Sequence, residues 1–184
     1  GCRARESRQR DIEVKLPVLP HPAHDRQFIM STITKTSLKI KSNSFKNNGA
    51  IPSKYCSEGL NVNPALYVED LPKHAKSLAI IVNDPDAKNG DYCHWIVWDV
   101  APKKTIKENS SPGIQGRNSK GINKYLGPCP PAGIHHYHFQ VFALDTKLTS
   151  LPPSSNEKEL KAAMQNHIIA KGVLIGLYKK MDVH

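Results

Sequence analysis

The chain has 184 residues, of which 39% are apolar, and this length and composition predict a single well-formed hydrophobic core. The formal net charge is +10, but the basic residues are spread along the chain and form no long block with interleaved aromatic residues, which argues against a nucleic-acid partner. No run of about 18 apolar residues occurs, so we expect no transmembrane segment.

The cysteines are widely spaced and form no C-x-x-C pair: Cys2, Cys56, Cys93 and Cys129. This spacing is typical neither of a zinc ribbon nor of a dense disulfide scaffold. It favours a reducing environment, and we therefore expect a cytoplasmic protein.

Residues 1–29 mix arginine, proline, histidine and acidic residues without helical or strand periodicity. They also lack the apolar core of a secretory signal peptide, whereas a regular pattern begins directly after Met30. We interpret residues 1–29 as an expression leader or an upstream segment, with a native disordered arm as the alternative. A single domain is then expected over residues 30–184.

Five segments after Met30 alternate apolar and polar residues or are rich in β-branched and aromatic side chains, which predicts strands. They cover residues 37–42, 77–84, 94–100, 136–145 and 172–180. The loops expected over 43–76 and 101–126 are long and rich in Asn, Ser, Lys, Pro and Gly. Long loops in a compact β domain often carry the functional site.

One helix is predicted late in the chain, with Asn156 as its N-cap and Glu159 as the capping-box partner. Its apolar face runs from Leu160 through Ile168, and the helix is expected to extend to Lys171 before Gly172 ends it. Together with the strands, this helix predicts a mostly β protein, an antiparallel β-sandwich with one late helix and long loops.

The apolar segment at 77–84 runs directly into Asp84-Pro85-Asp86. Pro85 holds the residue before it in an extended conformation, so Asp84 is expected at a strand end that cannot relax into a helix. Asp and Pro are common turn residues, and we assign that role to Asp86. Asp84 is a candidate site residue because it follows the buried segment directly.

His94 opens the next predicted strand, where a histidine is either a core residue or part of a site. Strict alternation along this strand predicts that one face carries His94, Ile96, Trp98 and Val100. Trp95 and Val97 are then expected on the opposite face.

The sequence GPCPPAG at 127–133 predicts a stiff loop, because its prolines restrict the backbone. Gly127 and Gly133 permit close approach of the backbone to other groups. Such a loop can direct amide N–H groups at a bound oxygen.

Alternation in the strand after this loop places His135 and Tyr137 on one face, and His136 and His138 on the other. The H-x-H pair His136 and His138 raises the alternative of a cupin-like, metal-dependent enzyme. No glutamate follows at a distance typical of a further ligand. We therefore prefer to interpret both residues as half-exposed polar positions on a sheet.

Four motifs follow one another along the chain: NPAL (63–66), DPDA (84–87), CHW (93–95) and GPCPPAGIHHYHFQVFALD (127–145). In order, spacing and content they resemble the phosphatidylethanolamine-binding proteins, a family that includes the Raf kinase inhibitor proteins. The resemblance extends in looser form from about Phe45 to Tyr178. The late helix and the VFALD ending of the last motif are similar to the compact bacterial and archaeal branch of the family.

This resemblance implies an antiparallel β fold with a small pocket for phosphate-like anions, such as a phospholipid head group. By position, the implied ligand-binding residues are Asp84, His94, Gly127, Cys129, Pro131, His135 and Tyr137. Pro131 would form a wall of the pocket and the amides of residues 127–129 its floor. The imidazoles and the phenol can donate hydrogen bonds to phosphate oxygens, and Asp84 can orient a histidine. Two departures from the family pattern, Lys88 in place of a proline and His136 between His135 and Tyr137, lie beside these residues.

We expect a binding protein without a cofactor. A hydrolase or isomerase that uses Asp84 with His94 or His135 as acid and base is the alternative, but no activated nucleophile and no G-x-S-x-G motif is recognised. The resemblance also implies a role as regulator or inhibitor, with a kinase or a protease as the protein partner. A homodimer is the oligomeric state that we consider.

Overall fold

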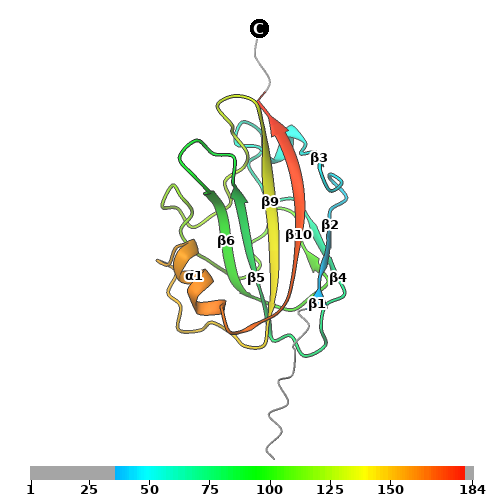
Figure 1. Ribbon diagram of the computed structural model, residues 1–184, viewed down its shortest axis with the longest axis vertical. Helices are drawn as coiled ribbons and strands as arrows, with labels where there is room; N and C mark the ends of the chain where they lie inside the picture. Colours follow the sequence, from blue (N-terminus) through cyan, green and yellow to red (C-terminus); the bar gives the residue numbers. More distant parts are fainter. Residues whose placement is uncertain (1–35, 181–184) are drawn as a thin grey trace, which may run out of the picture. The chain divides into compact units, whose positions relative to one another are not determined.

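The computed structural model describes residues 36–180, so the predicted boundary between residues 29 and 30 lies outside the described residues. Strands dominate this part of the chain, and its one α-helix occurs late (Figure 1). The elements are β1 (Thr36–Ser37), β2 (Lys39–Lys41), β3 (Gly49–Ala50), the 3-10 helix η1 (Ser53–Tyr55), β4 (Leu66–Glu69), β5 (Ser77–Asp84), β6 (Tyr92–Val100), β7 (Thr105–Ile106), β8 (Ile114–Gln115), β9 (Ile134–Leu144), α1 (Glu157–Met164) and β10 (Ile168–Lys179). The mostly β fold with one late helix is confirmed, although the segments predicted as long loops contain the short strands β3, β4, β7 and β8.

The strands form a sheet of seven and a sheet of three. The large sheet has the order β1-β10-β9-β5-β6-β8, and β3 also pairs with β10. Its long strands β5, β6, β9 and β10 pair in antiparallel fashion, whereas the short strands β1 and β3 pair with β10 in parallel. The small sheet has the order β2-β4-β7 and is antiparallel. The predicted sandwich therefore carries two short parallel pairings at the β10 edge.

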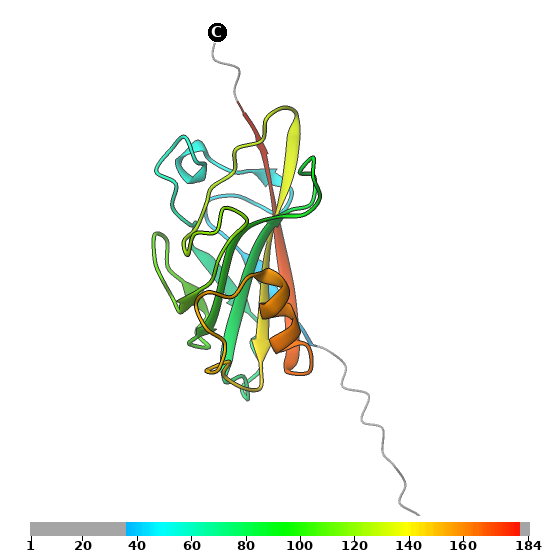
Figure 2. The same ribbon diagram turned by 90° about the vertical axis from the view of Figure 1, so that its left-hand side faces the viewer.

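The main hydrophobic core combines side chains of both sheets, including Trp95 and Phe139 from the large sheet and Leu66 from the small one. A second apolar cluster lies on the other face of the large sheet, where Leu160 and Met164 of α1 cover it. Figure 1 shows α1 beside β6 and away from β10, and Figure 2 shows the helix on one side of the large sheet. Within residues 36–180, no helix has the length and apolarity needed to cross a membrane.

Helix α1 begins as predicted but ends earlier. The side chain of Asn156 accepts the Glu159 N–H at 3.2 Å, and the Glu159 carboxylate accepts the Asn156 N–H at 2.8 Å, which forms the capping box. The predicted continuation through Ile168 to Lys171 is wrong, because the helix ends at Met164 and β10 begins at Ile168. Pairing along β9 satisfies the backbone groups of this segment, and that long-range ladder outweighs the local helical pattern.

An irregularity near the start of β6 breaks the predicted alternation. Asn83 pairs with Cys93, but the preceding Val82 pairs with Trp95, so His94 is an extra residue in the ladder. The prediction that His94 and Trp95 lie on opposite faces is therefore wrong. This β-bulge directs the His94 side chain to the face of the large sheet that meets the small sheet.

A second irregularity lies near the end of β6, where Leu78 pairs with Val100 and Ile80 with Val97. Asp99, between them, has a φ of 53°, in the left-handed region. Val100 consequently packs in the same core cluster as Val97, and its predicted place on the opposite face is wrong.

Candidate functional site

A pocket of about 620 Å³ lies at one end of the large sheet, where β5 ends and β6 and β9 begin. The residues predicted from the sequence as ligand-binding all line it: Asp84, His94, Gly127, Cys129, Pro131, His135 and Tyr137. Three strands and one loop therefore converge on the pocket. The strands hold the polar side chains in fixed positions, and the proline-rich loop closes one side.

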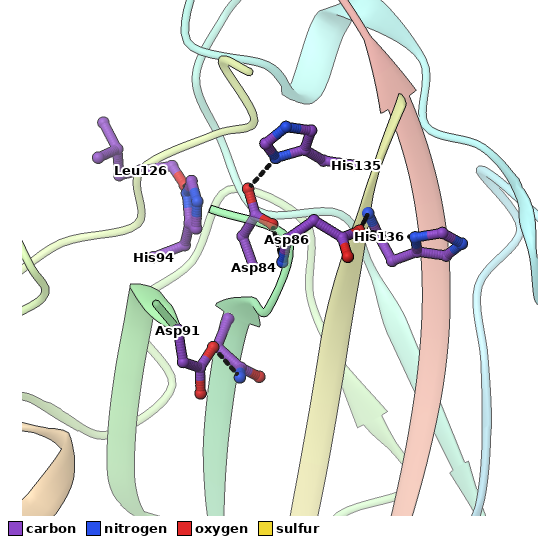
Figure 3. Close-up of polar contacts among 8 residues, drawn as sticks. Asp84, Asp86, Asp91, His94, Leu126, His135 and His136 are labelled. Atoms are coloured by element: carbon purple, nitrogen blue, oxygen red, sulfur yellow. Dashed lines mark hydrogen bonds and ion pairs between the residues drawn. The ribbon is translucent and has the colours of Figure 1, made fainter. Parts of the chain in front are cut away.

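Asp84 and His135 form a buried pair at this end of the sheet (Figure 3). His135 Nδ1 donates to Asp84 Oδ2 at 2.7 Å, and the exposed fractions of the two side chains are 11% and 5%. The other oxygen of Asp84 accepts the Asp86 N–H at 2.9 Å. Because Asp84 fixes the ring through Nδ1, His135 Nε2 remains available to the pocket.

His94 is held in one orientation by the loop on the far side of the pocket. Its Nδ1 donates to the Leu126 carbonyl at 2.8 Å, and its ring meets the Tyr137 ring edge-on at a centroid distance of 5.2 Å. Burial lowers the pKa of His94 below its ordinary value of 6.5, although the Leu126 carbonyl and the Asp84 carboxylate oppose this effect. The neutral ring thus keeps its proton on Nδ1 and presents a lone pair on Nε2.

The hydroxyl group of Tyr137 is fully buried and has no hydrogen-bond partner within residues 36–180. Burial raises the pKa of this phenol, Asp84 raises it further, and the amide of Cys129 opposes them. The hydroxyl therefore stays protonated. It meets no acceptor at hydrogen-bond geometry within residues 36–180, although the Asp84 carboxylate and the Cys129 amide are close enough to act on it. An unsatisfied buried donor costs about 1–3 kcal/mol, which a ligand oxygen in the pocket would offset.

Gly127 brings the loop into close contact with the chain at Tyr55 and Cys56. A Cβ atom added to Gly127 would lie 2.2 Å from the Tyr55 carbonyl oxygen and 2.8 Å from the Cys56 Cα. The Gly127 N–H donates to Asn61 Oδ1 at 2.7 Å, so the expectation that this amide forms a floor for the ligand is wrong. Residue 128 is a proline without an N–H, which leaves the amide of Cys129 beside Tyr137.

The model of the family described as phosphatidylethanolamine-binding protein matches residues 41–179. The chain belongs to the phosphatidylethanolamine-binding protein family. A UPF0098 protein of Pyrococcus horikoshii is 48% identical over 157 residues, a match that covers 79% of this chain and 78% of that protein. A UPF0098 protein of Methanothermobacter thermautotrophicus is 38% identical over 151 residues, covering 78% of this chain and 99% of that protein.

Solved structures of the phosphatidylethanolamine-binding protein family share this fold. A homologue from Chlamydia trachomatis superposes with a TM-score of 0.75 at 36% identity, and the match covers 79% of this chain and 99% of that chain. Escherichia coli YbcL superposes with a TM-score of 0.73 at 26% identity, covering 79% of this chain and 100% of that chain. These relatives come from archaea and bacteria, which confirms the predicted similarity to that branch.

Asp86 and His136 form a second pair in this family member, outside the pocket lining. Asp86 Oδ2 accepts from both the ring Nδ1 and the backbone N–H of His136, at 2.7 and 2.8 Å. These bonds hold the pKa of Asp86 below its usual range. Asp86 therefore does more than the predicted turn chemistry, because it ties the loop after β5 to the start of β9 (Figure 3).

Several other residues line the pocket that sequence reasoning did not select, among them Ser57, Lys88, Tyr92, Ser119 and Lys120. They come from segments that are distant in sequence, and none stands in a motif with a recognisable chemistry. Only the folded arrangement of the phosphatidylethanolamine-binding protein domain brings them to the same pocket.

Proposed function

We propose that the protein binds a phosphate-like anion, such as phosphate or a phosphorylated head group, in this pocket. The observation that supports the proposal most directly concerns Tyr137, which lines the pocket and whose buried hydroxyl meets no acceptor at hydrogen-bond geometry within the described residues. His135 stands beside it with Nε2 available, because Asp84 holds its other nitrogen. Hydrogen-bond donors that converge in a buried pocket favour an anionic oxygen as the ligand.

Asp84 allows His135 to act as a hydrogen-bond donor to the ligand when the ring is protonated. A protonated His135 remains balanced by the carboxylate at 2.7 Å and donates from Nε2 at the same time. Only this protonated form carries an N–H on Nε2, and in that form the pair presents a positively polarised donor to the pocket without an isolated buried charge. We infer a binding protein rather than an enzyme, since no activated nucleophile contacts the pair within residues 36–180.

The cupin-like alternative depends on His136 and His138. His136 Nδ1 is engaged by Asp86 in the structure, and residues 36–180 contain no group of three or more His, Cys, Asp or Glu side chains placed to hold a metal ion. These observations favour the anion site over a metal site. A kinase or protease partner, a homodimer and the cytoplasmic location stay predictions.

Replacing His135 with glutamine is expected to weaken binding of inorganic phosphate by about tenfold or more, because a hydrogen bond to a charged group contributes roughly 1.5–3 kcal/mol. Isothermal titration calorimetry at neutral pH measures the effect. His136→Gln is the matched control, since His136 is the adjacent residue, bonds an aspartate in the same way and does not line the pocket. Absence of phosphate binding by the unmodified chain, or equal weakening in both variants, would overturn the proposal.

The affinity for sulfate is expected to rise as the pH falls, because His94 then gains a proton on Nε2 and becomes a donor. The pKa of His94 lies below the ordinary 6.5, so the increase in sulfate affinity that is due to His94 occurs below pH 6.5. Between about pH 7 and pH 5 we expect an increase of about tenfold, which His94→Gln removes. Sulfate is the appropriate probe because its own charge is constant over this range. An acid rise that is unchanged in His94→Gln would exclude His94 from the anion site.

A further inference from the structure

Lys88 and Lys120 line the same pocket and are both exposed, so they stand at its mouth. They belong to different loops, one between β5 and β6 and the other between β8 and β9. Neither lysine forms a salt bridge with any residue from 36 to 180. Their charges are therefore available to whatever enters the pocket.

The turn that carries Lys120 is fixed by the buried side chain of Asn118. Asn118 Oδ1 accepts the Lys120 N–H at 2.9 Å, and its Nδ2 donates to the Lys124 carbonyl at 3.0 Å. The next residue, Ser119, donates its N–H to the Cys93 carbonyl at 2.9 Å. Because Cys93 directly precedes His94, these bonds hold the Lys120 backbone beside the histidine side of the pocket.

The loop that carries Lys88 is anchored at both ends. At its start, the Asp86 N–H donates to Asp84 and the Asp86 carboxylate accepts from the backbone of His136. At its end, the Asp91 carboxylate accepts from the Asn83 side chain. The backbone that carries Lys88 is thus placed by bonds to β5 and β9.

The two carboxylates among the lining residues have partners inside the protein. Asp84 is bonded to His135 and to the backbone of Asp86. Asp91 is bonded to Asn83, and Figure 3 shows its carboxylate well away from the Asp84 and His135 pair. Because Asn83 is neutral, the negative charge of Asp91 persists, and the charges of Lys88 and Lys120 exceed it by one positive unit.

We propose that the pocket selects phosphorylated compounds that carry a second anionic group, a carboxylate or another phosphate, and disfavours compounds whose second group is an ammonium ion. This inference rests on the proposed phosphate site. With the phosphoryl group held by His135 and Tyr137, the other end of a small ligand reaches the mouth. Two lysine ammonium groups there attract an anion and repel a cation.

Three probes of similar size separate this selectivity from phosphate binding itself: 2-phosphoglycolate, ethyl phosphate and O-phosphoethanolamine. Their second groups are negative, neutral and positive. Calorimetry at low ionic strength and about pH 7, above the second pKa of about 6 of a phosphate monoester, gives all three a mostly dianionic phosphoryl group. We expect the affinity to fall in that order by about threefold at each step, since an exposed charge pair contributes roughly 0.2–1 kcal/mol.

The double variant Lys88→Gln and Lys120→Gln is expected to bring the three affinities within about twofold of one another while ethyl phosphate still binds. Lys103→Gln with Lys147→Gln is the control, because both lysines are exposed and neither lines the pocket. The control is expected to keep the full order. Added salt is expected to reduce the differences in the unmodified chain.

The outcomes separate the two proposals. If none of the probes binds, ethyl phosphate included, the proposed phosphate site is overturned. If ethyl phosphate binds but O-phosphoethanolamine binds as well as or better than 2-phosphoglycolate, the selectivity is overturned and the phosphate site stands. A preference that persists in the Lys88 and Lys120 variant overturns the assignment of the selectivity to these lysines.

Discussion

Replacement of Asp84 by alanine is expected to lower the free energy of unfolding by about 3–5 kcal/mol, because it leaves one partner of a buried pair without its counterpart. The His135 Nδ1 and the Asp86 N–H both lose their acceptor. Neither group is compensated easily by water, since the side chains of Asp84 and His135 are only 5% and 11% exposed. The same change also removes the group that orients His135, so phosphate binding is expected to be lost.

Asp86→Ala is the matched control for this experiment. Asp86 also accepts from a histidine at 2.7 Å, but the exposed fractions in this pair are 41% for Asp86 and 49% for His136. Solvent screens such a pair, and we expect a loss of about 1 kcal/mol or less. Urea denaturation of both variants, with Asp84→Asn as a milder change, measures the difference. Similar losses at Asp84 and Asp86 would contradict the view that burial makes the first pair structurally important.

The strands of the large sheet were predictable because their composition is local information. The segment predicted at 77–84 coincides with β5, which is buried along its whole length and rich in β-branched residues. The capping box of Asn156 and Glu159 was predictable for the same reason, since both partners lie within one turn. The end of α1 was not, because the competing pairing of β10 with β9 involves residues that are far apart in sequence.

The bulge at His94 cannot be predicted from the alternation of apolar and polar residues alone. It arises from the register between β5 and β6, and no residue near His94 signals it. The family resemblance identifies His94 as a site residue, whereas strict alternation predicts the wrong face for its side chain. The bulge resolves this conflict, because it turns His94 toward Tyr137 while leaving Ile96 and Trp98 on the opposite face.

The positions of two asparagines that support the pocket, Asn61 and Asn118, could not be predicted from local sequence either. Asn61 bonds Gly127 across 66 residues of sequence, and Asn118 fixes the turn of Lys120 only because the fold buries its side chain. Asparagine in a loop is ordinarily interpreted as turn chemistry. The pocket lining itself was predictable from motifs, whereas the residues that hold the lining in place were not.

Gly127→Ala is expected to destabilise the protein by about 3 kcal/mol or more, which is at the upper end for an added methyl group in a packed site. The new Cβ would lie 2.2 Å from the Tyr55 carbonyl oxygen and 2.6 Å from the Cys56 carbonyl carbon. These are backbone atoms, so no side chain can rotate away to relieve the contact. Separation of the two segments would also weaken the bond from Ser57 N–H to the Pro128 carbonyl, now 3.0 Å.

Gly133→Ala separates this steric effect from the general effect of replacing a glycine in the same loop. Gly133 has a φ of 74°, and a Cβ added there meets no atom within 4 Å, so its replacement adds only backbone strain of about 1 kcal/mol. Thermal and urea denaturation of both variants gives the comparison, and calorimetry with phosphate reports the pocket. We expect Gly127→Ala to lose both stability and phosphate affinity, because displacement of Gly127 moves Cys129 away from Tyr137. Equal destabilisation of the two variants would show that the close approach at Tyr55 does not determine the position of the loop.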